Sequence, residues 1–257
     1  MTYVKAKKYL GQHFLKNEGV ASQIAESFDL NSANKYLEIG PGMGVLTKYF
    51  INNPSFYACE VDLESIDYLK QHYPDFSEQI YNIDFLQMDI PKYFETNVSI
   101  IGNFPYNISS QILFKVLENK EYVPHLVGMF QKEVAERICS GPGNKDYGIL
   151  SVLLQAYYNC KYLFTVLETD FIPPPKVKSG VISIARNETV KLDCDEVLFK
   201  KVVKTAFNQR RKTIRNSIKQ MTNGKISEHV FFSKRPEQLS VPQFVELTNI
   251  VADMQLD

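Results

Sequence analysis

Between residue 35 and about residue 185, short apolar runs alternate with stretches that have helical periodicity. Short runs rich in β-branched and aromatic residues predict strands, and longer amphipathic stretches predict helices. The expected strands are 35–40, 55–61, 97–103, 125–131, 162–168 and 180–186. The expected helices are 45–53, 63–73, 109–120 and 147–158. This alternation predicts a mainly parallel, doubly wound α/β sheet of the Rossmann-like type.

The character of the sequence changes after Arg186, where helical patterns follow one another without strands. We therefore expect two domains, a sheet domain over 1–186 and a small helical domain over 187–257. A chain of 257 residues, 44% hydrophobic and 23% charged, is sufficient for both. Helices of the second domain are expected at 195–207, 211–220 and 241–254.

Several functional classes are disfavoured by what the sequence lacks. No apolar run approaches the roughly 18–20 residues of a membrane span, and the chain does not open with a signal peptide. The four cysteines include no CxxC pair, and the four histidines form no metal-ligand pattern with them. We expect a monomeric cytoplasmic protein with neither a membrane nor a metal partner.

Positive charge is concentrated in three segments, although the formal net charge is zero. Segments 1–16, 171–186 and 200–219 hold 15 of the 29 Lys and Arg residues and no acidic residue. A single basic run is usually a solvated helix face. Several basic segments without acidic residues can instead form a cationic surface of the kind that binds a phosphate backbone. The distribution favours a polyanionic partner.

The first expected strand runs into EIGPGMG, in which Gly40, Gly42 and Gly44 alternate with other residues. Glycines at the end of a strand allow a tight turn and close approach of a ligand, although they can also serve the turn alone. Glu60 ends the next strand and could accept hydrogen bonds from ribose hydroxyls, and Asp84 could accept one from an adenine amine. The GxGxG spacing differs from the dinucleotide pattern GxGxxG and resembles motif I of S-adenosylmethionine (AdoMet) methyltransferases.

The strand at 97–103 ends in NFPY, which suits methyl transfer to an adenine amine. That nitrogen is a weak nucleophile, and two acceptors can orient it: the side-chain oxygen of Asn103 and a main-chain carbonyl near Phe104 or Pro105. Tyr106 could stack on a flipped-out base. Phe171 is the candidate for a second stacking ring, although a packing role is nearly as plausible, and NFPY could also be an ordinary strand exit.

Seven motifs in this order resemble the KsgA/RsmA/Dim-type ribosomal RNA adenine dimethyltransferases. They are KKYLGQHFL (7–15), YLEIGPGMGVLT (36–47), NFPYNISS (103–110), FQKEVAERI (130–138), FIPPPKVKSGV (171–181), FNQRRKTIRNS (207–217) and RPEQLSVPQFVEL (235–247).

The resemblance implies AdoMet-dependent conversion of two adjacent adenosines to N6,N6-dimethyladenosine. These adenosines lie in a hairpin loop near the 3′ end of small-subunit 16S rRNA, within an immature 30S particle. It also implies cofactor contacts and target-base contacts. The cofactor contacts fall on His13, Leu15, Gly40, Glu60, Asp84 and Asn103. The target-base contacts fall on Asn103, Tyr106 and Phe171.

The sequence departs from the family pattern at three positions. Phe104 stands where leucine or isoleucine is commoner, Gln111 where proline is frequent, and His13 where asparagine is frequent. Phe104 could either narrow the pocket for the second methylation or merely pack. We expect His13 to keep the hydrogen-bonding role of asparagine.

Three other functions remain open at this point. A macrolide-resistance methyltransferase of large-subunit 23S rRNA would share the NxPY site, but the motifs after residue 170 favour the small-subunit branch. A noncatalytic ribosome-assembly factor would not require NFPY and Glu60. A nicotinamide dehydrogenase would prefer GxGxxG and a catalytic His or Lys.

Overall fold

The computed structural model describes residues 4–222, 224–225 and 228–256. The chain folds into two compact units. Unit 1 holds the chain up to Ala135 together with Lys161–Arg186, and unit 2 holds Glu136–Cys160 and the chain from Asn187 onward. The expected sheet domain therefore differs from unit 1 by segment 136–160. The apolar side chains of that segment's helix, α6 (Ile149–Gln155), pack with the helices of unit 2, which its periodicity could not reveal. The outer limits of the predicted domains, 1 and 257, lie outside the described residues.

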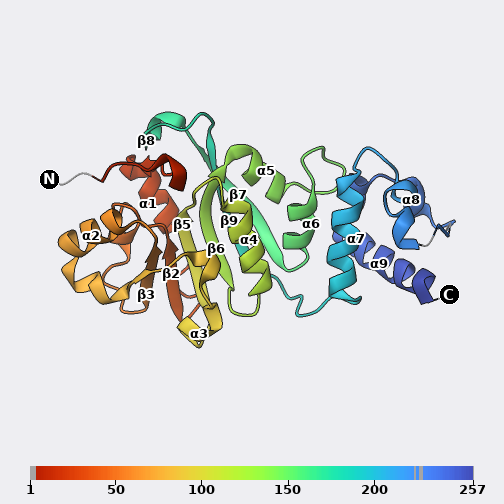
Figure 1. Ribbon diagram of the computed structural model, residues 1–257, viewed down its shortest axis with the longest axis horizontal. Coiled ribbons are helices and arrows are strands. Elements are labelled where there is room, and N and C mark those ends of the chain that lie inside the picture. The colour runs from red at the N-terminus through yellow and green to blue at the C-terminus, as the bar shows by residue number, and fades with distance from the viewer. Residues whose placement is uncertain (1–3, 223, 226–227, 257) are drawn as a thin grey trace. The chain divides into compact units, whose positions relative to one another are not determined.

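Seven strands form the main sheet in the order β4-β3-β2-β5-β6-β9-β7 (Figure 1). The pairs β2–β3, β3–β4, β2–β5 and β5–β6 are parallel, and β6–β9 is antiparallel, so the predicted mainly parallel sheet is confirmed. A separate two-stranded ladder joins β1 to β8. The strands are β1 (Phe14–Leu15), β2 (Lys35–Ile39), β3 (Phe56–Glu60), β4 (Ile80–Asn82), β5 (Val98–Asn103), β6 (His125–Gln131), β7 (Tyr158–Val166), β8 (Phe171–Ile172) and β9 (Ser179–Arg186).

Helices connect the strands, and side chains cap the first turns of three of them, with Asp89 at the start of α3 (Ile90–Phe94) as one. The Asn17 side chain accepts hydrogen bonds from the backbone at the start of α1, and the Asp62 side chain does so at the start of α2. These helices are α1 (Glu18–Glu26), α2 (Leu63–His72), α3 (Ile90–Phe94), α4 (Ser109–Glu118) and α5 (Lys132–Cys139).

The prediction of a helix at 45–53 is wrong. Only a 3₁₀ turn, Thr47–Tyr49, forms there. Leu46 and Phe50 are buried four residues apart, as a helix would bury them. The backbone nevertheless mixes hydrogen bonds to the third and to the fourth preceding residue. Such a series of turns can bury the same apolar residues as a helix would, so the spacing of apolar residues is the same in both.

Unit 2 is helical and contains α6, α7 (Glu196–Asn208), α8 (Ile214–Ser217) and α9 (Val241–Leu256) (Figure 1). Aromatic side chains from different segments meet in its core. The ring centroid of Phe207 lies 5.8 Å from that of Phe244 and 6.1 Å from that of Tyr147. The helix expected at 211–220 is reduced to the four residues of α8 and a following 3₁₀ turn, Lys219–Thr222.

Candidate active site

A cavity lies at the carboxyl ends of β2, β3 and β5, the edge at which α/β sheets bind ligands. Parallel pairing brings the ends of these strands together. Two residues that were predicted to contact the cofactor or the base, Leu15 and Phe171, do not line this cavity. The predicted residues that do line it are His13, Gly40, Glu60, Asp84, Asn103 and Tyr106.

The glycine loop is shaped by left-handed backbone at two positions that border the cavity. Gly40 has φ of 68°, and open space lies where a Cβ would stand. Gly42 has φ of 55°, and a Cβ there would lie 2.9 Å from the ring of Phe14. Other residues adopt such φ values at a cost, so both positions favour glycine. The loop thus exposes bare backbone to the cavity at Gly40.

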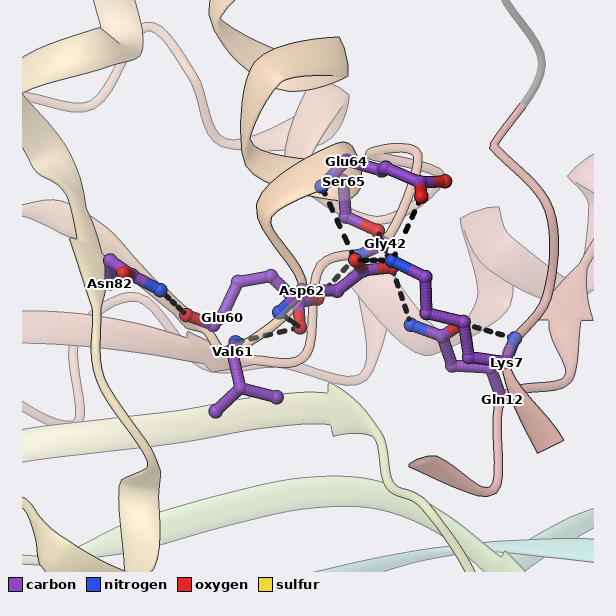
Figure 2. Close-up of polar contacts among 9 residues, drawn as sticks. All are labelled: Lys7, Gln12, Gly42, Glu60, Val61, Asp62, Glu64, Ser65 and Asn82. Carbon is purple, nitrogen blue, oxygen red and sulfur yellow. Dashed lines mark hydrogen bonds and ion pairs between the residues drawn. The ribbon is translucent and has the colours of Figure 1, made fainter. Parts of the chain in front are cut away.

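The Glu60 carboxylate is held by three backbone N–H groups (Figure 2). Its Oε1 accepts from Val61 at 2.8 Å and from Asp62 at 3.0 Å, and its Oε2 accepts from Gly42 at 3.2 Å. Burial raises the pKa of Glu60 above its ordinary value, and these hydrogen bonds offset part of that rise. The carboxylate is therefore fixed at the end of β3 with acceptor capacity left over.

The amide of Asn103 is oriented by the N-terminal segment. Its Nδ2 donates to the main-chain carbonyl of His13 at 2.9 Å, so the side-chain oxygen is the end left for another donor. In the following loop, the carbonyl of Pro105 accepts from the N–H of Ile108 at 3.2 Å. Of the two main-chain acceptors considered from the sequence, the Phe104 carbonyl is therefore favoured.

The ring of Tyr106 is held at its hydroxyl and on its face. The hydroxyl lies 2.5 Å from the Oγ of Ser179, a fully buried residue at the start of β9. The imidazole of His13 stacks on the ring with centroids 5.7 Å apart, and its Nδ1 donates to the carbonyl of Pro173 at 2.8 Å. Sequence reasoning missed Ser179, although it lies in the 171–181 motif that drew attention to Phe171.

Phe104 packs against a pair of glycines, which answers part of the question that the sequence left open. Gly102 of β5 and Gly128 of β6 are partners in the sheet, and the Phe104 ring lies over both. Its centroid lies 5.1 Å from that of Phe130, edge to face. The ring is 1% exposed, so its main role is packing beneath the loop that carries Asn103 and Tyr106.

We expect Gly128→Ala to destabilise the protein by about 1–3 kcal/mol, the usual range for overpacking. The new Cβ would lie 2.0 Å from the Phe104 ring, and the nearest atoms around it all belong to that ring. Phe104→Leu in the same chain should therefore restore stability, as measured by urea unfolding.

Gly102→Ala is the matched control for this pair. Its Cβ would also lie 2.7 Å from the main-chain carbonyl of Ile39, which cannot move aside. Phe104→Leu should not restore that variant, and equal rescue of both glycine substitutions would contradict this account of the packing.

Phe171 and Leu15 are partners in the β1–β8 ladder and belong to the same buried cluster. Phe171 is 1% exposed and Leu15 is 4% exposed. The structure thus gives Phe171 the packing role that was the alternative to base stacking, because its ring would have to leave the core to reach a base. The apolar, β-strand-like FI of 171–172 was the signal for this outcome.

Sequence reasoning missed Glu38, whose buried carboxyl group lies beside the cavity. It is 1% exposed, accepts a hydrogen bond from the Thr47 hydroxyl at 2.6 Å, and lines a small second cavity together with Gly40 and Asn103. Burial raises its pKa to about 8. An acid in the middle of an apolar strand, as in YLEIG, was the available signal.

The described parts of the chain hold neither a helix suited to crossing a membrane nor a group of three or more His, Cys, Asp and Glu residues that could bind a metal ion.

Comparison with known proteins shows which protein family this chain resembles over nearly its whole length. The family model for ribosomal RNA adenine dimethylase matches residues 3–253. Proteins named ribosomal RNA small subunit methyltransferase A from Flavobacterium johnsoniae and Cytophaga hutchinsonii are 56% and 53% identical to it. The first alignment covers 96% of both chains, and the second covers 98% of this chain and 99% of the relative.

Solved structures show the same fold. A dimethyladenosine transferase from Plasmodium falciparum has a TM-score of 0.77 at 23% identity, over 95% of this chain and 98% of that one. The 23S rRNA methyltransferase ErmE has a TM-score of 0.67 at 23% identity, over 92% of this chain and 99% of that one. The Rossmann-like methyltransferase fold is confirmed, and the chain belongs to the ribosomal RNA adenine dimethylase family.

Proposed function

We propose that this protein uses AdoMet to dimethylate the N6 amines of two adjacent adenosines near the 3′ end of 16S rRNA. The substrate would be an immature 30S particle in the cytoplasm, and the modification would accompany its maturation by a monomeric enzyme. The observation that carries the proposal is the Asn103 amide, held by His13 so that its oxygen is available at the cavity. The names of relatives that are 53–56% identical support the choice of rRNA.

The residues that line the cavity fit AdoMet. Gly40 leaves open space beside bare backbone, which suits the methionine part of the ligand. The fixed carboxylate of Glu60 would accept from the ribose hydroxyls. Asp84 uses its Oδ1 to accept from the N–H of Leu86 at 2.9 Å, which leaves Oδ2 for the adenine amine. When bound, AdoMet supplies an electrophilic methyl group on a sulfonium.

The acceptors beside Asn103 would make the target amine nucleophilic. The Asn103 oxygen and the Phe104 carbonyl each take a hydrogen bond from the amine, which turns its lone pair towards the methyl carbon. Tyr106, held by Ser179, stacks on the base and keeps it in place. Catalysis is then mainly positioning.

Unit 2 offers a cationic surface for RNA. In segment 200–219 the exposed basic residues include Arg211, Lys212, Arg215 and Lys219. Arg210 is also exposed, but its Nη2 donates to the carbonyl of Lys145 at 2.6 Å, so it also holds a neighbouring loop.

Reversing Arg211 and Arg215 together, each to Glu, should weaken binding to immature subunits and flatten its dependence on salt, because fewer counterions are released. AdoMet affinity should not change. Lys70→Glu with Lys92→Glu is the matched control, since both lysines are exposed in unit 1 outside the three basic segments. Equal losses in the two double variants would show that net charge, not this surface, governs binding.

The decisive test of the function is to incubate the protein and labelled AdoMet separately with small and large subunits from a strain that lacks the modification, and to map the label. Two adjacent dimethylated adenosines in 16S rRNA are expected. Label in 23S rRNA would favour the macrolide-resistance type of activity, and binding without label would favour a noncatalytic assembly factor.

A further inference from the structure

Polar contacts fix the N-terminal segment 7–13 through Lys7 and Gln12 (Figure 2). Residues 9–13 of this segment line the cavity. Lys7 forms ion pairs with Asp62 and Glu64, and the Nε2 of Gln12 donates to the second oxygen of Asp62 at 3.1 Å. The backbone N–H of Lys7 donates to the side-chain oxygen of Gln12 at 2.8 Å, which closes the segment on itself.

The other end of the segment lies against the NFPYN loop. Gly11 has φ of 67°, and a Cβ there would lie 2.7 Å from the Oδ1 of Asn107. The carbonyl of His13 accepts from Asn103, as described above. The segment is therefore anchored both at the cofactor end of the cavity, by Lys7, and at its catalytic end.

Between these anchors, a 3₁₀ turn, Lys8–Leu10, carries Tyr9 at the rim of the cavity. Tyr9 lines the cavity, yet it is 77% exposed. Lys5 and Lys8, also exposed, flank it in a segment without acidic residues. An aromatic ring on a cationic rim is the combination that binds unpaired nucleotides, with the ring stacking on a base and the cations facing phosphates.

We propose that Tyr9 is a second nucleobase site, on which the adenosine next to the one being methylated stacks. The inference rests on the proposed function, in which the two target adenosines are adjacent and only one can occupy the site beside Asn103. The neighbouring base loses its stacking partner when the target flips out, and an exposed ring at the rim replaces that partner.

A stacking site suits this neighbour for a chemical reason. Dimethylation removes both hydrogens of the amine. A site that accepted hydrogen bonds from the amine would therefore bind the unmodified neighbour but not the modified one. A π face remains in either state. Tyr9 can therefore hold the neighbour before and after its own methylation.

The test compares Tyr9→Ala, Tyr9→Phe and the wild type as full chains, with unmodified small subunits as substrate. Tyr9→Ala should raise KM for subunits on the order of tenfold, the effect of one lost base stack, with an unchanged AdoMet dissociation constant. Subunits with only one dimethylated adenosine should accumulate. Tyr9→Phe keeps the ring and should behave as the wild type.

Tyr49→Ala is the control, because Tyr49 is 41% exposed in the same unit and does not line the cavity. It should leave KM and the products unchanged. A wild-type KM in Tyr9→Ala, or a loss in Tyr9→Phe equal to that in Tyr9→Ala, would overturn the inference while the proposed function stood. A wild type that does not methylate small subunits would overturn both.

Discussion

Replacing Asn103 with alanine is expected to lower the rate of methyl transfer on the order of 10²–10³-fold, the loss typical of removing one fixed polar group from a reaction centre. The target amine would keep only the Phe104 carbonyl as acceptor, and its lone pair would no longer be directed at the methyl group. The AdoMet dissociation constant should change much less, because Gly40, Glu60 and Asp84 remain. Single-turnover methylation and calorimetric titration with AdoMet measure the two quantities separately.

Asn103→Asp separates the two ends of the amide. It keeps an acceptor oxygen but loses the Nδ2 that donates to His13. We expect a rate between those of the wild type and the alanine variant. If the alanine variant methylates subunits at nearly the wild-type rate, the acceptor mechanism is wrong.

Glu38→Gln is expected to remove a large part of the pH dependence of stability. The folded protein holds the Glu38 proton up to a pKa of about 8, whereas the unfolded chain releases it near the ordinary value of 4.5. Between these values the unfolded state binds fewer protons, so the free energy of unfolding falls as pH rises. The full effect is on the order of 5 kcal/mol.

Urea unfolding of the cofactor-free protein at several values between pH 5 and pH 8 measures this effect. Glutamine can still accept from Thr47, and its buried NH₂ adds a cost that does not vary with pH. The stability of the variant relative to the wild type should therefore increase steadily with pH. Parallel curves for the two proteins would mean that Glu38 is ionised in the fold throughout this range.

Apart from His13, the predicted residues that line the cavity lie at or near the ends of buried parallel strands. Gly40, Glu60 and Asn103 each follow an apolar run, and parallel pairing brings such ends to one edge of the sheet. Asp84 and Tyr106 lie within a few residues of such ends and share the cavity. Local sequence was sufficient for these residues, because the parallel topology brings the ends of their strands together.

The parts that sequence could not place depend on contacts between distant segments. Ser179 meets Tyr106 across 73 positions. His13 was predicted as a site residue, but its main-chain contact with Asn103, across 90 positions, was not. The burial of Phe171 and the grouping of segment 136–160 with unit 2 have the same cause, since an apolar run does not state which partner will bury it. The pattern at 45–53 did report burial correctly but could not distinguish a helix from a series of turns.

The glycine pair beneath Phe104 links substitutions at separate positions. Gly128 has to be glycine only because a phenylalanine ring lies over it, whereas Gly102 also faces the Ile39 carbonyl. We therefore expect a relative with leucine or isoleucine in place of Phe104 to tolerate alanine at the position of Gly128 but not at that of Gly102. Positions 104 and 128 should therefore co-vary across the family, because the phenylalanine ring occupies the space that a side chain at position 128 would need.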